Sequence, residues 1–566
     1  MTEIPLDERP EELFLFRNII IKLFVNSYKI FSMNVASRFF RLVLSISTGV
    51  LLSLSWLGFP GWLLFVALVP LLILDRFFVE NRSAYKSVAF WGHALLAFLI
   101  WNGLTTWWIS YATLAGAFMA IVANAFLMSL VWWLAHTARR RFNPGLGYVA
   151  LAVFWISFEF FHFHWDIEWP WLILGNGFAG NVKMIQWYEF TGTLGGTLWI
   201  LIMNVLIFKV LLLLWERGPV KRLIYPGGVL LFLLVLPVTY SFLRYHAYTE
   251  KEDPVNIVIV QPSIDPYSER YDRQAENEKL RKFTGLAGEK TDETTDLVIG
   301  PETVFERYPD WNEARLHANF LFRELTAWMQ KYPRAEIIFG ASTSKVYKNA
   351  GEATPTARHV NDVFYDVFNS AVFIGRSGEA QIYHKSILVP GVEKMPFRKY
   401  LGILNDIVID LGGTTGSLGR QAKPVNFELK DGSKVAPVIC YESVFGKYLT
   451  RFVQKGAGLI VVITNDGWWR NTPGYKQHLS FARLRAIETR RSVARAANTG
   501  ISAFINQRGD LQQTTGWWTE TAIKQSLNAN REITFYVKHG DYIARISLLI
   551  AGLLLLLLLV HRFIRF

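Results

Sequence analysis

Three short segments of the chain place a reactive side chain at the end of a predicted strand. Glu302, Lys385 and Cys440 occupy these positions. Reactive groups in α/β folds lie just past the carboxyl ends of strands, where loops converge on a pocket. A carboxylate, an ammonium and a thiol placed in this way predict a nucleophilic catalytic site.

The three side chains complement one another chemically. A thiol has a pKa of about 8.5 and is mostly protonated near neutral pH, so it needs a base. Glu302 can take the proton of Cys440, while the Lys385 ammonium favours the resulting thiolate and helps to stabilise an oxyanion. Taken singly, a cysteine at a strand end is more often an inert core thiol, and a glutamate or lysine is usually a solvated surface group. The shared context of the three supports a site.

The amino-acid composition indicates the environment, water or membrane, in which part of this chain folds. Of the 566 residues, 51% are hydrophobic, 15% are aromatic and only 19% are charged. These values exclude a disordered chain, a coiled coil and a typical soluble enzyme, and they indicate a membrane protein. The length favours two or more units. Cys440 is the single cysteine, which excludes a disulfide framework and any metal site made of several cysteines.

The net charge of +13 is unevenly distributed along the chain. Residues 41–247 hold 20 charged residues in 207, whereas residues 251–542 hold 71 in 292. The first density is typical of a membrane body and the second of a water-soluble domain, so we expect no nucleic-acid partner. The predicted organisation is an N-terminal cytoplasmic or interfacial segment (1–40), a seven-helix transmembrane domain (41–250), a catalytic domain (251–542) and a C-terminal transmembrane helix with a short cytoplasmic tail (543–566).

Eight segments are candidates to span a bilayer, which requires about 20 mostly apolar residues. They are 41–58, 61–75, 88–108, 114–135, 146–163, 194–215, 224–243 and 543–561. The second is short and would be extended by Phe77 and Phe78. Lysine and arginine concentrate in the loops after the second, fourth and sixth segments, and cytoplasmic loops retain positive charge. This alternation predicts cytoplasmic termini and an extracytoplasmic 251–542 domain. Residues 13–33 are read either as an amphipathic helix on the inner leaflet or as a disordered leader.

Short apolar runs alternate with helical patterns throughout 251–542. The runs are 255–260, 297–300, 337–340, 371–374, 435–439 and 459–463, and the helical patterns include 320–331 and 477–498. Continuous apolar strands separated by helices predict buried sheets covered by helices, which is an α/β sandwich.

The motifs around the three reactive residues resemble those of a known family. Gly300-Pro301-Glu302, Tyr383-His384-Lys385 and Val438-Ile439-Cys440-Tyr441-Glu442 resemble the Glu-Lys-Cys signature of the nitrilase superfamily. Segments 389–393, 464–469 and 168–175 resemble its membrane branch, the apolipoprotein N-acyltransferases. The likeness extends over nearly the whole chain from about residue 41.

The resemblance implies a role for each matching residue. Glu302 is implied as the general base, Lys385 as the stabilising cation and Cys440 as the nucleophile that accepts the acyl group. The implied supporting or substrate-binding residues are Glu393, Tyr441, Glu442, Trp468 and Tyr271. The chain departs from the family pattern at 389–393, which reads Val-Pro-Gly-Val-Glu instead of Val-Pro-Phe-Gly-Glu, and at Tyr271, where the family has tryptophan. These departures bear on head-group contacts and loop motion more than on the reaction class.

The resemblance also implies a reaction and its partners. Such enzymes move an acyl chain from a membrane phospholipid, typically phosphatidylethanolamine, to the N-terminal α-amino group of a diacylglyceryl-cysteine in an apolipoprotein. The implied mechanism is ping-pong, through a thioester on Cys440, and we expect no cofactor and no metal. The implied setting is a monomeric, multi-pass protein of the bacterial inner membrane with its nitrilase-like domain on the periplasmic side.

Two other functions stay open at this point. A membrane-tethered amidase or nitrilase would pass the acyl group to water, and nothing in the sequence excludes water as the acceptor. A transporter or receptor with a non-catalytic outer domain would make Cys440 dispensable. A metal or proton site built from Glu159, His162, His164 and Asp166 has little support, because the spacing of the two histidines does not place them on one face of a helix.

Overall fold

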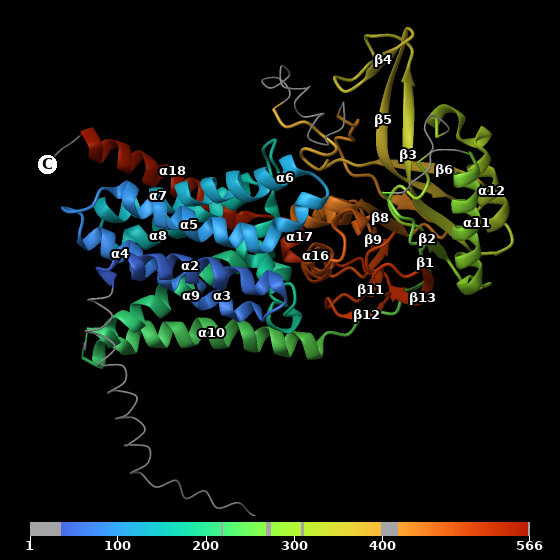
Figure 1. Ribbon diagram of the computed structural model, residues 1–566. Coiled ribbons are helices and arrows are strands. Elements are labelled where there is room, and N and C mark those ends of the chain that lie inside the picture. Colours follow the sequence, from blue (N-terminus) through green and yellow to red (C-terminus); the bar gives the residue numbers. More distant parts are fainter. Residues whose placement is uncertain (1–34, 217–218, 268–272, 307–310, 398–416, 564–566) are drawn as a thin grey trace, which may run out of the picture.

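The computed structural model describes residues 35–216, 219–267, 273–306, 311–397 and 417–563. It consists of a bundle of long helices and an α/β domain at one end of that bundle (Figure 1). Tyr271 and the segment 13–33 lie outside the described residues.

Eight helical segments in the described residues are long and apolar enough to cross a membrane, which confirms the expected number. They are Arg38–Leu57, Gly61–Glu80, Ser87–Tyr111, Leu114–Arg141, Pro144–Phe161, Tyr188–Trp215, Lys221–Ala247 and Tyr542–Val560. Their principal helices are α2 (Arg38–Leu54), α4 (Val69–Glu80), α5 (Ser87–Thr106), α7 (Asn124–Arg141), α8 (Pro144–Phe161), α9 (Tyr188–Trp215), α10 (Lys221–Ala247) and α18 (Tyr542–Phe563). Two short helices, α3 (Leu64–Ala67) and α6 (Leu114–Phe118), complete the second and fourth segments.

The α/β domain contains two sheets. The first has the order β13-β1-β2-β3-β5-β4 with β6 paired to β5, and the second has the order β12-β11-β10-β9-β8-β7. The strands are β1 (Pro254–Gln261), β2 (Leu297–Ile299), β3 (Glu336–Tyr347), β4 (Arg358–Val360), β5 (Val363–Ile374), β6 (Ala380–His384), β7 (Phe427–Glu428), β8 (Lys434–Ile439), β9 (Leu459–Thr464), β10 (Val493–Ala497), β11 (Ala503–Ile505), β12 (Leu511–Thr514) and β13 (Thr521–Asn528). The central strands β1, β2 and β3 are parallel, as are β8, β9 and β10.

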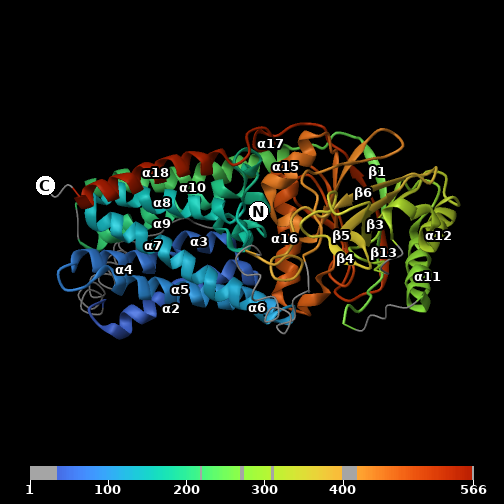
Figure 2. The ribbon, with the colours of Figure 1, turned by 90° about the horizontal axis from the view of Figure 1, so that it is seen from above.

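Alternate residues of the first sheet face two different hydrophobic cores, as the two-residue period of a strand requires. Val258 and Val298 pack beneath the outer helices α11 (Arg273–Lys290) and α12 (Phe320–Met329). Ile257 and Leu297 belong to the core shared with the second sheet. Helices α15 (Gly446–Gln454) and α16 (Pro473–Thr489) cover the other face of that second sheet (Figures 1 and 2). This arrangement confirms the predicted α/β sandwich.

Helix α16 joins the α/β domain to the helical bundle. Gln477 on α16 accepts a hydrogen bond from Trp171 Nε1 at 2.7 Å. Its amide nitrogen lies 3.1 Å from the carbonyl oxygen of Trp56 and 3.2 Å from that of Thr105. One buried side chain on α16 therefore contacts three separate segments of the membrane part.

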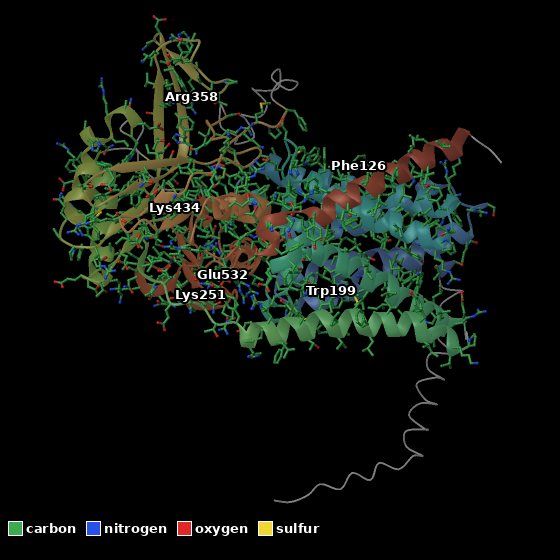
Figure 3. The ribbon with its side chains drawn as sticks, turned by 180° about the vertical axis from the view of Figure 1, so that it is seen from behind. Phe126, Trp199, Lys251, Arg358, Lys434 and Glu532 are labelled. Atoms are coloured by element: carbon green, nitrogen blue, oxygen red, sulfur yellow. The ribbon has the colours of Figure 1, made fainter. Side chains whose placement is uncertain are left out.

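Two ion pairs fix the ends of the α/β domain. Lys251 Nζ lies 2.6 Å from Glu532 Oε1, so the chain enters from α10 and leaves toward α18 on the same side of the domain (Figure 3). Arg490, just after α16, lies 2.7 Å from Glu189 near the start of α9. The two parts are thus tied together by buried charge as well as by packing.

The predicted helix over 477–498 is wrong beyond residue 489. Arg490 adopts a left-handed conformation with φ of 51° and ends α16, and the next residues form strand β10 between β9 and β11. The alanine-rich segment Val493–Ala497 has a helical composition, but burial in the centre of a sheet overrides that preference. Arg490, Arg491 and Arg495 are buried within this packing and are not exposed on a helix face.

Candidate active site

The ends of three strands bring Glu302, Lys385 and Cys440 together between the two sheets. Lys385 follows β6, and its Nζ lies 3.1 Å from Oε1 of Glu302, which follows β2. Cys440 follows β8, and its thiol lies close enough to Glu302 and Lys385 for both charges to shift its pKa. All three are buried, with exposed fractions of 6%, 1% and 8% respectively. The three residues that the sequence places at strand ends therefore share one buried site.

The Glu302 carboxylate is held by donors from three segments. Its Oε1 accepts from Asn369 Nδ2 at 2.7 Å as well as from Lys385, and its Oε2 accepts from the backbone N–H of Asn465 at 3.0 Å. Asn369, on β5, also donates to Glu393 Oε1 at 2.9 Å. Asn369 was not identified from the sequence, although a polar amide within the run 367–374 is a signal in an otherwise apolar buried strand.

The backbone around Glu302 requires a glycine on the neighbouring strand. A Cβ atom added to Gly340 of β3 would lie 2.4 Å from the nitrogen of Thr303 and 2.6 Å from Cα of Glu302. Thr303 itself has a positive φ of 45°. Because backbone atoms cannot yield to a new side chain, Gly340 lets β3 approach closely enough to fix the position of the carboxylate.

Lys385 lies between two carboxylates. Its Nζ is 2.8 Å from Glu393 Oε1 in addition to its contact with Glu302. Burial alone lowers the pKa of an ammonium, but the negative charges of Glu302 and Glu393 outweigh it and raise the pKa of Lys385 well above its usual value. Glu393 Oε2 accepts from the backbone N–H of Val389 at 2.8 Å, which holds the loop after Lys385. The site therefore contains a fixed cation.

Cys440 begins a sharp turn between β8 and the 3-10 helix Cys440–Val444. Its φ of 49° lies in the left-handed region, which is uncommon for a residue other than glycine. Burial raises the pKa of the thiol, the charge of Glu302 raises it further, and the opposing effect of Lys385 is smaller. A thiol in this environment would need a base to act as a nucleophile.

Glu442 connects the strand end that carries Cys440 with the strand end that carries Lys385. Its Oε1 accepts from Tyr383 Oη at 2.6 Å and from Ser386 N at 2.7 Å, and its Oε2 accepts from Ile439 N at 2.9 Å. Burial raises the pKa of Glu442 to about 7, against the lowering effect of these hydrogen bonds. With its oxygens occupied in this way, Glu442 is suited to positioning the two strand ends.

A buried hydrogen-bond network holds the turn at Cys440 against helix α16. His478 Nε2, on α16, lies 3.1 Å from the carbonyl oxygen of Cys440 and 2.9 Å from Ser443 Oγ, and its Nδ1 lies 3.0 Å from Asp466 Oδ1. Arg495 Nη2 donates to Asp466 Oδ2 at 2.7 Å. Burial opposes ionisation of Asp466, but Arg495 and His478 outweigh it and hold its pKa well below the usual range. Sequence reasoning missed this network.

Tyr441 contacts the loop between α8 and α9. Its hydroxyl donates to the carbonyl oxygen of Glu168 at 2.6 Å. Its ring stacks on Trp169 with a centroid separation of 6.4 Å, and Trp169 stacks on Trp171 at 5.6 Å. The segment 168–175 of the membrane part therefore lies directly against the residue that comes after the nucleophile.

The other residues singled out in the sequence have different surroundings. Trp468 is 40% exposed, and its carbonyl oxygen accepts from Tyr267 Oη at 2.8 Å, so it lies at the surface. Glu159 accepts hydrogen bonds from Trp155, from Thr197 and from a backbone N–H in the loop after α8. These three protein donors give Glu159 a structural role in joining α8, that loop and α9.

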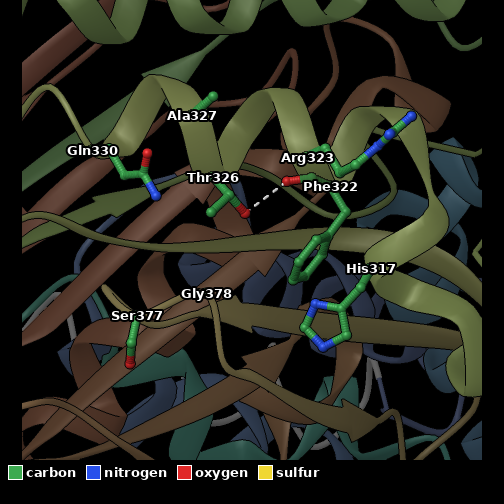
Figure 4. A pocket seen from close by; sticks show the side chains of 8 residues that line it. All are labelled: His317, Phe322, Arg323, Thr326, Ala327, Gln330, Ser377 and Gly378. Atoms are coloured by element: carbon green, nitrogen blue, oxygen red, sulfur yellow. Dashed lines mark hydrogen bonds between the residues drawn. The ribbon is translucent and has the colours of Figure 1, made fainter.

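A separate surface pocket lies on the outer helical layer. It is lined by His317, Phe322, Arg323, Thr326, Ala327, Gln330, Ser377 and Gly378 (Figure 4). Ser377 and Gly378 precede β6, at the opposite end of that five-residue strand from Lys385. A strand of that length spans about 17 Å, and the pocket contains none of the candidate catalytic residues.

Comparisons with known proteins agree with both parts of the structure. Residues 257–532 match the family model described as carbon-nitrogen hydrolase, and residues 48–206 match that of the apolipoprotein N-acyltransferase N-terminal domain. Among solved structures, the nitrilase-superfamily protein Nit3 of Saccharomyces cerevisiae is 17% identical with a TM-score of 0.34, and the match covers 50% of this chain and 93% of that one.

Two curated relatives match over almost their whole length. An apolipoprotein N-acyltransferase of Chlorobaculum tepidum is 30% identical, over 92% of this chain and 96% of its own. An apolipoprotein N-acyltransferase of Geobacter metallireducens is 26% identical, over 89% of this chain and 92% of its own. With this extent of similarity across both the helical bundle and the α/β domain, the chain belongs to the apolipoprotein N-acyltransferase family.

Proposed function

We propose that this protein transfers an acyl chain from a membrane phospholipid, such as phosphatidylethanolamine, to the N-terminal α-amino group of a diacylglyceryl-cysteine in an apolipoprotein. The observation that carries the proposal is the buried cluster of Glu302, Lys385 and Cys440 directly against the membrane segment 168–175. A soluble amidase would not require a nucleophile that adjoins membrane helices. Membership of the family supports the same reaction.

In the first half-reaction, the Cys440 sulfur attacks the carbonyl carbon of a phospholipid ester while its proton passes to Glu302. Lys385 stabilises the negative charge that develops on the carbonyl oxygen, because it is a fixed cation in a buried site. The tetrahedral intermediate collapses with cleavage of the carbon–oxygen bond. The leaving alkoxide takes the proton from Glu302 and departs as lysophospholipid, which leaves a thioester on Cys440.

In the second half-reaction, the neutral α-amino group of the lipoprotein attacks the thioester carbon. Glu302 accepts a proton from the attacking nitrogen and returns it to the sulfur as the carbon–sulfur bond breaks. The products are the N-acylated lipoprotein and the free Cys440 thiol. Both half-reactions use the same base and the same cation, so no further group is needed to balance protons.

A hydrolase with the same triad would pass the acyl group to water, so the two functions differ in the fate of the thioester. We expect phospholipid alone to yield one lysophospholipid per protein molecule and a persistent thioester. A diacylated lipopeptide should then discharge the thioester and give a triacylated product, whereas a lipopeptide with a blocked N-terminus should not. Continuous release of lysophospholipid without any amine, at the rate measured with it, would establish water as the acceptor.

We further propose that the protein is a monomer in the bacterial cytoplasmic membrane with its α/β domain on the periplasmic side. This is supported by the positive charge in the loops at the opposite end of the bundle, which include Arg139, Arg140 and Arg141 at the end of α7. A monomer is consistent with this proposal because one chain supplies Glu302, Lys385 and Cys440 to the site.

Single introduced cysteines test this orientation in a Cys440→Ala background. A membrane-impermeant maleimide should label Ala350→Cys, an exposed position in the loop between β3 and β4, in intact spheroplasts. Ser83→Cys, exposed in the loop after α4, should be labelled only after permeabilisation. The reverse pattern would place the α/β domain in the cytoplasm and overturn the proposed orientation.

A further inference from the structure

Arg470 combines a strained backbone with an exposed guanidinium group. It follows the 3-10 helix Asp466–Trp469 and adopts φ of 51° and ψ of −165°. This region of conformational space is almost exclusive to glycine, so an arginine there lowers the stability of the fold, and such strain is typical of functional positions. In the described part of the chain, no carboxylate lies within ion-pair distance of its guanidinium.

The guanidinium lies over aromatic rings at the junction of the two parts of the protein. Its central carbon is 4.7 Å from the ring centroid of Tyr111 and 5.8 Å from that of Tyr267. Tyr111 ends the 3-10 helix Trp107–Tyr111, which follows membrane helix α5. Stacking on Tyr111 and a hydrogen bond with the Tyr267 side chain orient the planar guanidinium and leave its remaining N–H groups free to donate.

The surroundings of Arg470 are apolar and exposed. Tyr111, Tyr267, Trp468 and Trp107 are 39%, 49%, 40% and 42% exposed respectively. Aromatic side chains with one polar end favour the interface between membrane and water. A cation set among such rings, at the end of a membrane helix, matches a lipid with an anionic phosphate and apolar chains.

The same short segment leads directly into the active site. Asn465, at the start of the 3-10 helix, donates its backbone N–H to the Glu302 carboxylate. Trp469, on the inner side, packs on the buried Trp108 with a centroid separation of 4.7 Å. Asn465 and Arg470 are five positions apart, on either side of the 3-10 helix Asp466–Trp469. At a rise of about 2.0 Å per residue, they are separated by about 10 Å along the chain. In a phospholipid, the phosphate and the reacting ester are likewise separated only by the glycerol backbone.

We propose that Arg470, oriented by Tyr111 and Tyr267, binds the phosphodiester of the donor phospholipid and so places its ester at Cys440. This inference rests on the proposed function and assigns it a donor-binding residue. The arginine recognises the phosphate common to phospholipids and leaves the acyl chains to the apolar surface. The position therefore keeps a functional side chain in a backbone conformation that glycine would adopt without strain.

The test compares Arg470→Gln and Arg470→Gly with the matched control Lys476→Gln, which removes another exposed cation adjacent to a tyrosine ring in the same domain. We expect KM for phosphatidylethanolamine in thioester formation to rise about tenfold in both Arg470 variants, as the loss of one charge-assisted hydrogen bond predicts. Arg470→Gly should also raise Tm, because it relieves the backbone. The rate of transfer from preformed thioester to lipopeptide, and the behaviour of Lys476→Gln, should not change.

A binding measurement separates failure of this inference from failure of the proposed function. In a Cys440→Ala background, which cannot form the thioester, tryptophan fluorescence reports binding of dihexanoyl phosphatidylethanolamine, dihexanoylglycerol or inorganic phosphate. Arg470→Gln should weaken binding of the phospholipid about tenfold and leave dihexanoylglycerol unaffected, and inorganic phosphate should not compete at matched concentration. Unchanged phospholipid affinity, an equal loss for dihexanoylglycerol, competition by free phosphate, or a lower Tm with unchanged KM in Arg470→Gly would each overturn the inference. Absence of a thioester in the unaltered protein would instead refute the proposed function.

Discussion

Replacing Cys440 with alanine is expected to reduce lipopeptide N-acylation by a factor on the order of 10⁴ or more, because every turnover passes through the thioester in the proposed mechanism. The substitution removes one buried sulfur atom and should lower the free energy of unfolding by about 1 kcal/mol at most. The protein should therefore accumulate in membranes in normal amounts. The measurement is the rate of triacylated product formation per amount of protein.

Cys440→Ser keeps the volume and polarity of the side chain and serves as the structural control. Its hydroxyl is a much weaker nucleophile than a thiol, so its acylation should be nearly as slow as that of the alanine variant. A transporter or receptor with a non-catalytic outer domain would retain its activity in both variants. Retention of one tenth or more of the normal rate in either one would remove Cys440 from the mechanism.

Glu302→Gln and Lys385→Met are each expected to slow thioester formation by about 100-fold or more. The glutamine cannot accept the thiol proton, and its NH2 group would face either the donors of Lys385 and Asn369 or the backbone N–H of Asn465. The methionine has a similar shape to lysine but cannot stabilise negative charge on the carbonyl oxygen. Single-turnover formation of acyl-enzyme from phospholipid measures the step directly.

Lys434→Met is the matched control for the lysine variant. Lys434 lies in the same domain, is 42% exposed and pairs with Glu428 at 3.8 Å on the surface (Figure 3). Surface pairs of this kind contribute about 0 to 1 kcal/mol, so this variant should form the thioester at the normal rate. Near-normal rates in both the Glu302 and the Lys385 variants would show that neither side chain takes part.

The strand ends that carry Glu302 and Cys440 were predictable because each comes after an uninterrupted apolar run. Such a run indicates a buried strand wherever it occurs, and the carboxyl end of a parallel strand is where loops converge. Lys385 follows the mixed polar and apolar segment Ala380–His384, which pairs antiparallel with β5. The sequence alone could not relate the two sheets to each other. The contacts of Asn369 with Glu302 and of His478 with the turn at Cys440 depend on that packing, and no spacing rule connects residues so far apart in the chain.

Other features were missed because local preference and final environment disagree. Strand β12 is exposed along its length, so it carries no apolar run. The segment of β10 has a helical composition and becomes a strand because β9 and β11 flank it. The backbone conformation of Arg470 is equally invisible, since the sequence does not show that a position favours glycine when another residue occupies it.

The thioester on Cys440 is the central claim, and intact mass spectrometry tests it most directly. The purified protein is incubated with phosphatidylethanolamine carrying an isotope-labelled acyl chain, without any lipoprotein, and is then digested to locate the label. We expect a mass increase equal to one acyl chain, confined to the peptide that contains Cys440, released by neutral hydroxylamine and absent from Cys440→Ala. An unmodified protein that nevertheless produces lysophospholipid and triacylated lipopeptide, or a label on any other residue, would contradict this claim.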